Sequence, residues 1–199
     1  MESTWNNKVL SDMFGANEGT ALRLKLVALV VLGVVLLAVA AKIKVPMWPV
    51  PITMGTFAVL TIGAAYGARL GLVTILAYMI VGALGFDVFA GSSAEKFGLT
   101  YMMGGTGGYL VGYVLATLAL GALAQRGWDR SVVWMALAML IGNVLIYVPG
   151  LAWLGHLYGW DKPILAWGLT PFLVGDAIKL ALAALVLPAA WKLVGRARG

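Results

Sequence analysis

The chain has no cysteine, one histidine and few charged residues. Without cysteine it can form no disulfide, no thiolate metal site and no cysteine nucleophile. The single histidine, His156, cannot build a site that needs several histidines. Only 11% of the 199 residues are charged, whereas a soluble domain carries about 25%. This is too little charge to cover a surface that faces water, so the composition excludes an ordinary soluble domain.

Nucleotide-binding signatures are missing as well. No G-x-x-x-x-G-K-[ST] sequence occurs, and no acidic motif suits Mg²⁺. Any ATP-driven step would therefore need another chain, and we expect no cofactor and no metal. The net charge of +6 is spread over the ends of apolar runs. Such spreading is typical of membrane-flanking loops and argues against a nucleic-acid partner.

What the chain has in abundance is apolar sequence. Hydrophobic residues make up 62% of it, and the mean hydropathy is +0.95. A membrane span needs about 20 mostly apolar residues. We expect an all-α integral membrane protein, a compact bundle of six transmembrane helices that forms a single domain over 1–199. The predicted spans are 26–41, 52–66, 70–85, 108–124, 132–154 and 171–193.

The first apolar run resembles a signal peptide in one respect. It follows basic residues and ends near Ala38-Val39-Ala40, which looks like a cleavage site. However, it begins late, and further spans follow it. We therefore expect it to be retained as the first span.

Lys and Arg residues predict the orientation, because they are enriched on the cytoplasmic side of membranes. With both termini in the cytoplasm, nine of the 14 lie inside, four lie outside, and Lys179 lies within the last span. The inner set is Lys8, Arg23, Lys25, Arg69, Arg126, Arg130, Lys192, Arg196 and Arg198. The outer set is Lys42, Lys44, Lys96 and Lys162. The asymmetry favours cytoplasmic termini.

Lys179 and Asp176 stand out because charges inside a span are costly and usually functional. Their spacing of three places them on one helix face, where they can pair. One interpretation is a structural ion pair. The other, which we favour, is a ligand site in which Lys179 meets an anionic group and Asp176 accepts hydrogen bonds or holds Lys179.

The orientation also places several irregular segments on the outer side with this pair. They are the proline-rich stretch 45–51, the polar loop 87–96 and the glycine cluster 104–108. Irregular backbone at membrane depth is tolerated where it is buried or lines a cavity. These segments predict a solute pocket that opens outward.

Small residues raise a choice between helix packing and binding. Gly108, Gly112 and Ala116 form a small-residue stripe that favours close helix packing, with backbone approach to a ligand as the alternative. A second stripe on the inner side is predicted to dock a partner helix, or else only to pack the second span against the third. It consists of Gly63, Gly67 and Gly71. On the fifth span, Asn143, Tyr147 and Trp153 are packing residues, interfacial anchors or ligand contacts.

Four stretches, in order and in matching topological positions, resemble the BioY family of biotin-specific S components of energy-coupling factor (ECF) transporters. They are 45–53 (VPMWPVPIT), 85–91 (GFDVFAG), 105–110 (GTGGYL) and 171–179 (PFLVGDAIK). The resemblance implies a six-helix subunit of the bacterial inner membrane that binds biotin from outside, with uptake driven by a transmembrane T subunit and ABC-type ATPases.

The resemblance also implies a set of ligand-binding residues. Asp176 and Lys179 match the Asp and Lys of the family's last helix. Lys96 stands in a loop where the family often has Arg, and Gly55 where it often has Gln. Biotin offers a carboxylate, a ureido group and an apolar ring and chain, which suits a pocket with few polar groups and aromatic walls. The further expected contacts are Thr53, Phe89, Tyr109, Asn143, Tyr147 and Trp153, with Trp48 as another aromatic wall.

Other functions stay open at this point. There are three alternative interpretations. The chain could be an S component for a different small vitamin, a stand-alone solute carrier or a structural scaffold. An intramembrane enzyme has little support, because no His/Glu cluster or Ser-His pair is available beyond His156. The choice between a monomer and a homo-oligomer also stays open.

Overall fold

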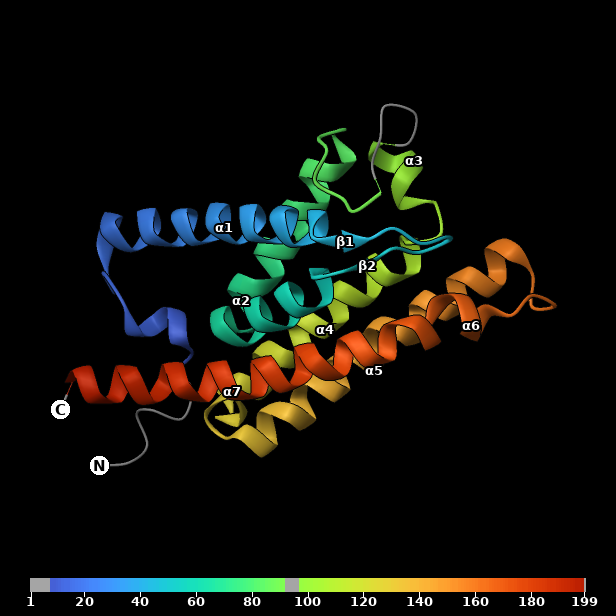
Figure 1. The fold of residues 1–199 in the computed structure, drawn as a ribbon. Helices are drawn as coiled ribbons and strands as arrows, with labels where there is room; N and C mark the ends of the chain where they lie inside the picture. The colour runs from blue at the N-terminus through green and yellow to red at the C-terminus, as the bar shows by residue number, and fades with distance from the viewer. Residues whose placement is uncertain (1–7, 92–96, 199) are drawn as a thin grey trace.

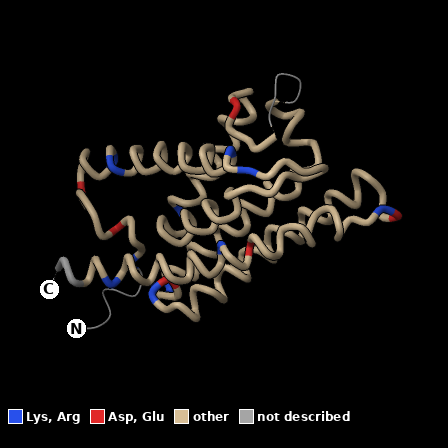
Figure 2. The backbone as a smooth tube through the Cα atoms, in the orientation of Figure 1, with Lys and Arg blue, Asp and Glu red and all other residues tan. Residues whose placement is uncertain are grey.

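The computed structural model describes residues 8–91 and 97–198, and most of them lie in helices. Long apolar sequences fold this way in lipid because a helix satisfies every backbone hydrogen bond internally. Five helices of the described part are long and apolar enough to cross a membrane. Figure 2 shows the charged residues mainly near helix ends and connections, with long uncharged stretches between them. The chain is therefore a multi-pass helical membrane protein.

The elements follow one another in a simple order (Figure 1). A short 3-10 helix, η1 (Leu10–Met13), precedes α1 (Gly19–Lys42). A hairpin of β1 (Lys44–Val45) and β2 (Ile52–Thr53) leads into α2 (Gly55–Ala83). The remaining elements are α3 (Gly98–Met102), α4 (Gly107–Gln125), η2 (Trp128–Arg130), α5 (Val132–Tyr158), α6 (Ile164–Gly168), η3 (Thr170–Phe172) and α7 (Leu173–Arg198). The helices extend beyond most of the predicted spans, and residues 52–53 belong to β2 rather than to a helix.

A sharp bend at Gly67 divides α2 into two helical parts, 55–66 and 68–83. Gly67 has φ 76° and ψ 174°, a conformation that only glycine adopts readily. The two parts fold back on each other, since a Cβ on Gly71 would lie 3.5 Å from the Cα of Gly63. The parts correspond to the predicted second and third spans, and the connection between them is a single residue.

Helix α4 lies at the centre of the bundle, packed between α2 and α5. The close approach of α4 to α5 depends on glycines. A Cβ on Gly112 would lie 2.6 Å from the Cα of Ile146, and one on Gly108 would lie 2.3 Å from the backbone oxygen of Pro149. Ala116 is fully buried in the same stripe. The packing role predicted for these three residues is confirmed.

The N-terminal segment covers the bend of α2. Val9 and Met13 are buried, and the methyl carbons of Val9 lie 3.3 Å from the position of a Cβ on Gly67. Arg130 donates a hydrogen bond to the carbonyl of Lys8 (3.1 Å). The guanidinium of Arg130 also stacks over the ring of Trp191 at 4.4 Å. This segment therefore ties η1 to η2 and α7.

Asp129 in η2 is a buried carboxylate beside this segment. It accepts a 2.5 Å hydrogen bond from Nε1 of Trp191, while its Oδ1 has no hydrogen-bond partner in the described part of the chain. Burial raises the pKa of Asp129 to about 6, although the Trp191 hydrogen bond and the charge of Arg130 oppose the rise. The folded protein therefore binds this proton more tightly than the unfolded chain does.

The consequence is a specific pH dependence of stability. Because the folded-state pKa is raised, the stabilisation is present below pH 4 and is lost as the pH rises through 6. The loss over this window is about 3 kcal/mol for this group. We expect Asp129→Asn to remove that part of the slope, measured as the unfolding midpoint in detergent between pH 4 and pH 7. An unchanged slope in the variant would contradict the assignment to Asp129.

Candidate ligand site

The predicted charge pair lies at the centre of a polar cluster that joins three helices. Nζ of Lys179 donates to Oδ1 of Asp176 (2.9 Å) within α7 and to Oγ1 of Thr56 (3.0 Å) on α2. The hydroxyl of Thr56 in turn reaches Oδ1 of Asp176 (3.3 Å). Tyr147 on α5 donates a short hydrogen bond to Oδ2 of Asp176. Both charged residues are buried, with 5% of Asp176 and 7% of Lys179 exposed.

This cluster is close to neutral overall, because one carboxylate faces one ammonium. Lys179 has three N–H groups, and two of them are used within the cluster. The carboxylate of Asp176 accepts three hydrogen bonds and so has little capacity left. The arrangement can still offer one charge-assisted N–H donor to a ligand. It does not present an unbalanced positive charge.

A small hollow, which we call the deep hollow, lies directly against Lys179. It measures about 30 Å³, which is room for one or two water molecules. Four of its eight lining residues are aromatic, and the hydroxyl of Tyr109 donates to the carbonyl of Gly168 (2.8 Å). The lining residues are Pro51, Thr53, Thr56, Tyr109, Tyr113, Tyr147, Phe172 and Lys179. The deep end of the site is thus narrow, half aromatic in its lining, and polar chiefly at the cluster, with Thr53, Tyr109 and Tyr113 as further hydroxyl-bearing residues.

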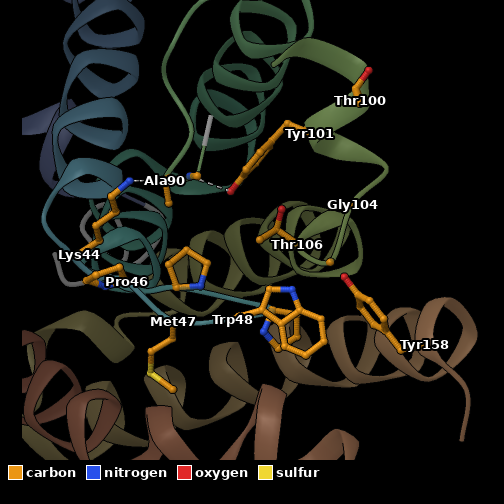
Figure 3. A pocket seen from close by; sticks show the side chains of 14 residues that line it. Lys44, Pro46, Met47, Trp48, Ala90, Thr100, Tyr101, Gly104, Thr106 and Tyr158 are labelled. Atoms are coloured by element: carbon orange, nitrogen blue, oxygen red, sulfur yellow. Dashed lines mark hydrogen bonds between the residues drawn. The ribbon is translucent and has the colours of Figure 1, made fainter. Parts of the chain in front are cut away.

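A much larger pocket of about 340 Å³ lies near the surface of the protein (Figure 3), and we call it the outer pocket. It is built by the β1–β2 hairpin on one side and by α3 and the glycine cluster on the other. Its lining residues are Lys44, Pro46, Met47, Trp48, Pro49, Pro51, Ala90, Gly91, Thr100, Tyr101, Gly104, Gly105, Thr106 and Tyr158. This volume falls within the range of small-molecule sites, about 300–1,000 Å³.

A third hollow of about 40 Å³, the middle hollow, lies between these two spaces. It shares Thr53 and Tyr113 with the deep hollow, and Tyr101 and Thr106 with the outer pocket. Pro51 lines all three spaces. The three spaces therefore follow one another from the surface to Lys179, and the proline-rich hairpin is their common wall.

Two lysines of the hairpin region hold the segment 87–91 against the outer pocket. Lys42 pairs with Asp87 (2.5 Å) and donates to the carbonyl of Phe89 (2.8 Å). Lys44, in β1, donates to the carbonyl of Ala90. As Figure 3 shows, Lys44 lies at the edge of the outer pocket. Within the described residues, Lys44 is the one cation that lines this pocket.

The structure brings five of the predicted ligand-binding residues together at the deep hollow: Thr53, Tyr109, Tyr147, Asp176 and Lys179. Phe89 is buried beside the middle hollow and stacks on Tyr101 at 5.0 Å. Trp48 lines the outer pocket, as expected for an aromatic wall. Lys96 lies outside the described residues.

Trp153 and Asn143 have other surroundings. Nε1 of Trp153 donates to the carbonyl of Gly104 (2.8 Å), so this side chain fastens the glycine cluster to α5. Asn143 lines a groove between α5 and α7, together with Tyr147 and Asp176. Neither lines the deep hollow or the outer pocket.

Reasoning from the sequence missed several residues. Tyr113 is four positions after Tyr109 on α4, so helical spacing from a recognised residue would have indicated it. Thr56 is on α2 whereas Thr53 belongs to β2, so no such spacing indicates Thr56. Tyr113 fills the space beside Gly55, since its hydroxyl lies 3.0 Å from the position of a Cβ there. Lys44 had been counted only as a loop cation.

The structure contradicts the docking role predicted for Gly63, Gly67 and Gly71. All three are buried. A Cβ on Gly63 would lie 3.0 Å from the backbone oxygen of Thr117 on α4, and one on Gly71 would lie 2.9 Å from the methyl group of Thr117. The stripe therefore packs the two parts of α2 against each other and against α4, which is the alternative that the sequence left open.

Comparisons with known proteins agree with this architecture. The model of the BioY family matches residues 13–196. The chain is 39% identical to a probable biotin transporter BioY of Pyrococcus horikoshii over 165 residues, which cover 83% of this chain and 95% of the relative. It is 33% identical to the biotin transporter BioY of Thermotoga maritima over 151 residues, 76% of this chain and 86% of the relative.

A solved structure has the same fold. It is a crystal structure of the S-component for biotin from an ECF-type ABC transporter, with a TM-score of 0.71 and 18% sequence identity, covering 88% of this chain and 95% of that one. At this identity the likeness concerns the fold. The family match extends over nearly the whole chain, and the chain belongs to the BioY family.

Proposed function

We propose that this protein is the S component that captures biotin from the outer side of the membrane for uptake. The observation that carries the proposal is the row of three spaces that ends at the Asp176–Lys179 cluster. The names of the BioY relatives and of the solved S-component supply the substrate. Binding and transport, rather than catalysis, are the activities that this site supports.

The charge distribution suggests how biotin lies in the site. The deep cluster is balanced and retains one N–H donor, which suits the neutral ureido oxygen. The carboxylate carries a full charge and is better placed at the rim, beside Lys44 and near water. We therefore propose the ureido ring at the deep end and the carboxylate at Lys44. This differs from the expectation that Lys179 meets the carboxylate. The deep hollow is smaller than the ligand, so the hairpin wall at Pro51 must move as biotin enters.

The same proposal includes the topology. The bend at Gly67 divides one of the five long helices into two, which supports six spans in total. Both termini are cytoplasmic, and the outer pocket faces outward, because nine cations lie on the inner side and four on the outer. The membrane is the bacterial inner membrane. Partners are biotin, lipid, a transmembrane T subunit and ABC-type ATPases, since no nucleotide-binding motif is present. No cofactor or nucleic acid takes part.

Binding of labelled biotin to the purified, detergent-solubilised protein tests the function, with no nucleotide added. We expect saturable binding that unlabelled biotin competes and that other small vitamins do not. Retention of a different vitamin would identify an S component of another specificity. Absence of binding to any of them would contradict the proposal.

Lys44→Ala tests the orientation of biotin. We expect the affinity for biotin to fall about tenfold, which is about 1.4 kcal/mol for a lost charge-assisted contact at an exposed position. The affinity for biotin amide, which has no charge there, should change less than twofold. The matched control is Lys162→Ala, an outer cation paired with Asp161 that lines none of the three spaces. Equal losses for the acid and the amide would place the carboxylate elsewhere.

Single cysteines test the topology, because the chain has none of its own. Asp161→Cys, between α5 and α6, should react with an impermeant thiol reagent on intact cells. Arg126→Cys, at the end of α4, should react only after permeabilisation. Both positions are exposed. The reverse pattern would turn the outer pocket toward the cytoplasm.

A further inference from the structure

Tyr147 and Thr56 join the charge pair from two different helices. The pair itself belongs to α7, whereas Tyr147 comes from α5 and Thr56 from α2. Their hydroxyls contact Asp176 and Lys179 and bind nothing else among the hydrogen bonds of the described chain. The orientation of the two charged groups thus depends on two neutral side chains that sequence reasoning either assigned to ligand contact or missed.

Tyr147 also separates two environments. One side of it lines the deep hollow next to Lys179. The other lines a groove between α5 and α7 of about 420 Å³, which Asp176 also lines. Apart from Tyr147, Asp176 and Asn143, the groove is apolar, with Leu140, Val144, Val148, Leu151, Leu169, Leu173, Ala177 and Leu180 as its walls. Asp176, whose Oδ2 accepts from the Tyr147 hydroxyl, therefore borders this mostly apolar space.

This position makes the hydroxyl of Tyr147 unusually important. A buried acceptor that loses its only donor suffers the full cost of desolvation, and the cost is greater for a charged group. Without the phenol hydroxyl, Oδ2 would have no hydrogen-bond donor among the described residues. The carboxylate would then turn toward Lys179 and Thr56, and the remaining ammonium N–H would no longer point into the hollow.

Thr56 acts on the same pair from the opposite side. Its Oγ1 accepts from Lys179 and donates to Asp176, so it bridges the two charges. Because Lys179 has three N–H groups, the bonds to Thr56 and Asp176 determine the direction of the third. A threonine methyl group at this place is not needed for the bridge, and serine would preserve it.

We propose that Tyr147 and Thr56 are positioning residues of the biotin site, which orient Asp176 and Lys179 so that one ammonium N–H faces the ureido oxygen. The inference rests on the proposed function. It assigns Tyr147 a role through Asp176 instead of a direct ligand contact, and it explains why a residue from each of three helices meets at one carboxylate. Binding of biotin then requires that α2, α5 and α7 are packed around the charge pair.

Equilibrium binding of biotin to purified variants tests the proposal. We expect Tyr147→Phe and Thr56→Val to lower the affinity at least tenfold, and Thr56→Ser to restore it to within threefold of the wild type. Tyr66→Phe is the matched control, since it also removes a tyrosine hydroxyl bond, here a part-buried one to the carbonyl of Leu29 (3.0 Å), but lies on the α1–α2 contact. Its affinity should stay unchanged.

A double-mutant cycle separates positioning from general packing. In an Asp176→Asn background, Tyr147→Phe should change the affinity less than threefold, because the group that it positions is already altered. Undiminished loss in that background would contradict the proposal, as would tenfold loss in Thr56→Ser. Wild-type protein that does not bind biotin would refute the proposed function. Wild-type binding with an unaffected Tyr147→Phe variant would refute the positioning role alone.

Discussion

Lys179→Met is expected to lose biotin binding and much of the stability of the folded protein. The substitution keeps the length of the side chain but leaves the carboxylate of Asp176 without its counter-charge. Removal of one partner from a buried ion pair costs about 3–5 kcal/mol. The thermal unfolding midpoint in detergent and the equilibrium affinity for labelled biotin measure the two effects.

The neutral double variant Asp176→Asn with Lys179→Met distinguishes the two losses. It removes both charges, so much of the stability should return, whereas biotin binding should not. A double variant that binds biotin with normal affinity would show that the charge pair only holds the helices together. That outcome would favour the structural ion pair, the alternative that the sequence alone left open.

Gly121→Ala is expected to destabilise the fold strongly, because the added methyl group would collide with backbone. A Cβ on Gly121 would lie 2.2 Å from the nitrogen of Ala68 and 2.4 Å from the carbonyl carbon of Gly67. These atoms belong to the bend of α2, which cannot shift without moving both of its helical parts. We expect a destabilisation of at least about 3 kcal/mol, at the upper end of the range for overpacking.

The matched control for this variant is Gly195→Ala near the end of α7. A Cβ there meets no atom within 4 Å, so the change should be neutral or slightly stabilising through helix propensity. The yield of monodisperse protein and its unfolding temperature compare the two variants. A Gly121→Ala protein that folds with an unchanged unfolding temperature would mean that α4 does not approach the bend this closely.

The helical architecture was predictable from the sequence because it depends on long apolar runs and on prolines and cations between them. Spans predicted at 52–66 and 70–85 anticipated the two parts of α2, since Arg69 interrupts the apolar run. Their single-residue connection was not predictable. It depends on the backbone of Gly67, and many other glycines of the chain lie inside ordinary helix.

The site was predictable where it depends on local spacing. Asp176 and Lys179 are three residues apart on one helix, so their pairing follows from helical geometry. Thr56 and Tyr147 come from distant parts of the chain, and only the packing of α2, α5 and α7 brings them to the pair.

The inner glycine stripe shows the limit of pattern reasoning in membranes. Gly63, Gly67 and Gly71 have the spacing of a helix-docking surface, but that spacing assumes one continuous helix. Because the chain reverses at Gly67, Gly63 and Gly71 come to face each other inside the bundle. A pattern of small residues indicates close packing but does not say which helix is the partner.

The N-terminal segment has a practical meaning for anyone who modifies this protein. Val9 covers the place where the chain reverses direction, and Met13 is buried in the same core, so these residues form part of the packed bundle. Shortening the protein to the start of α1 would uncover backbone at Gly67 and detach Arg130 from the carbonyl of Lys8.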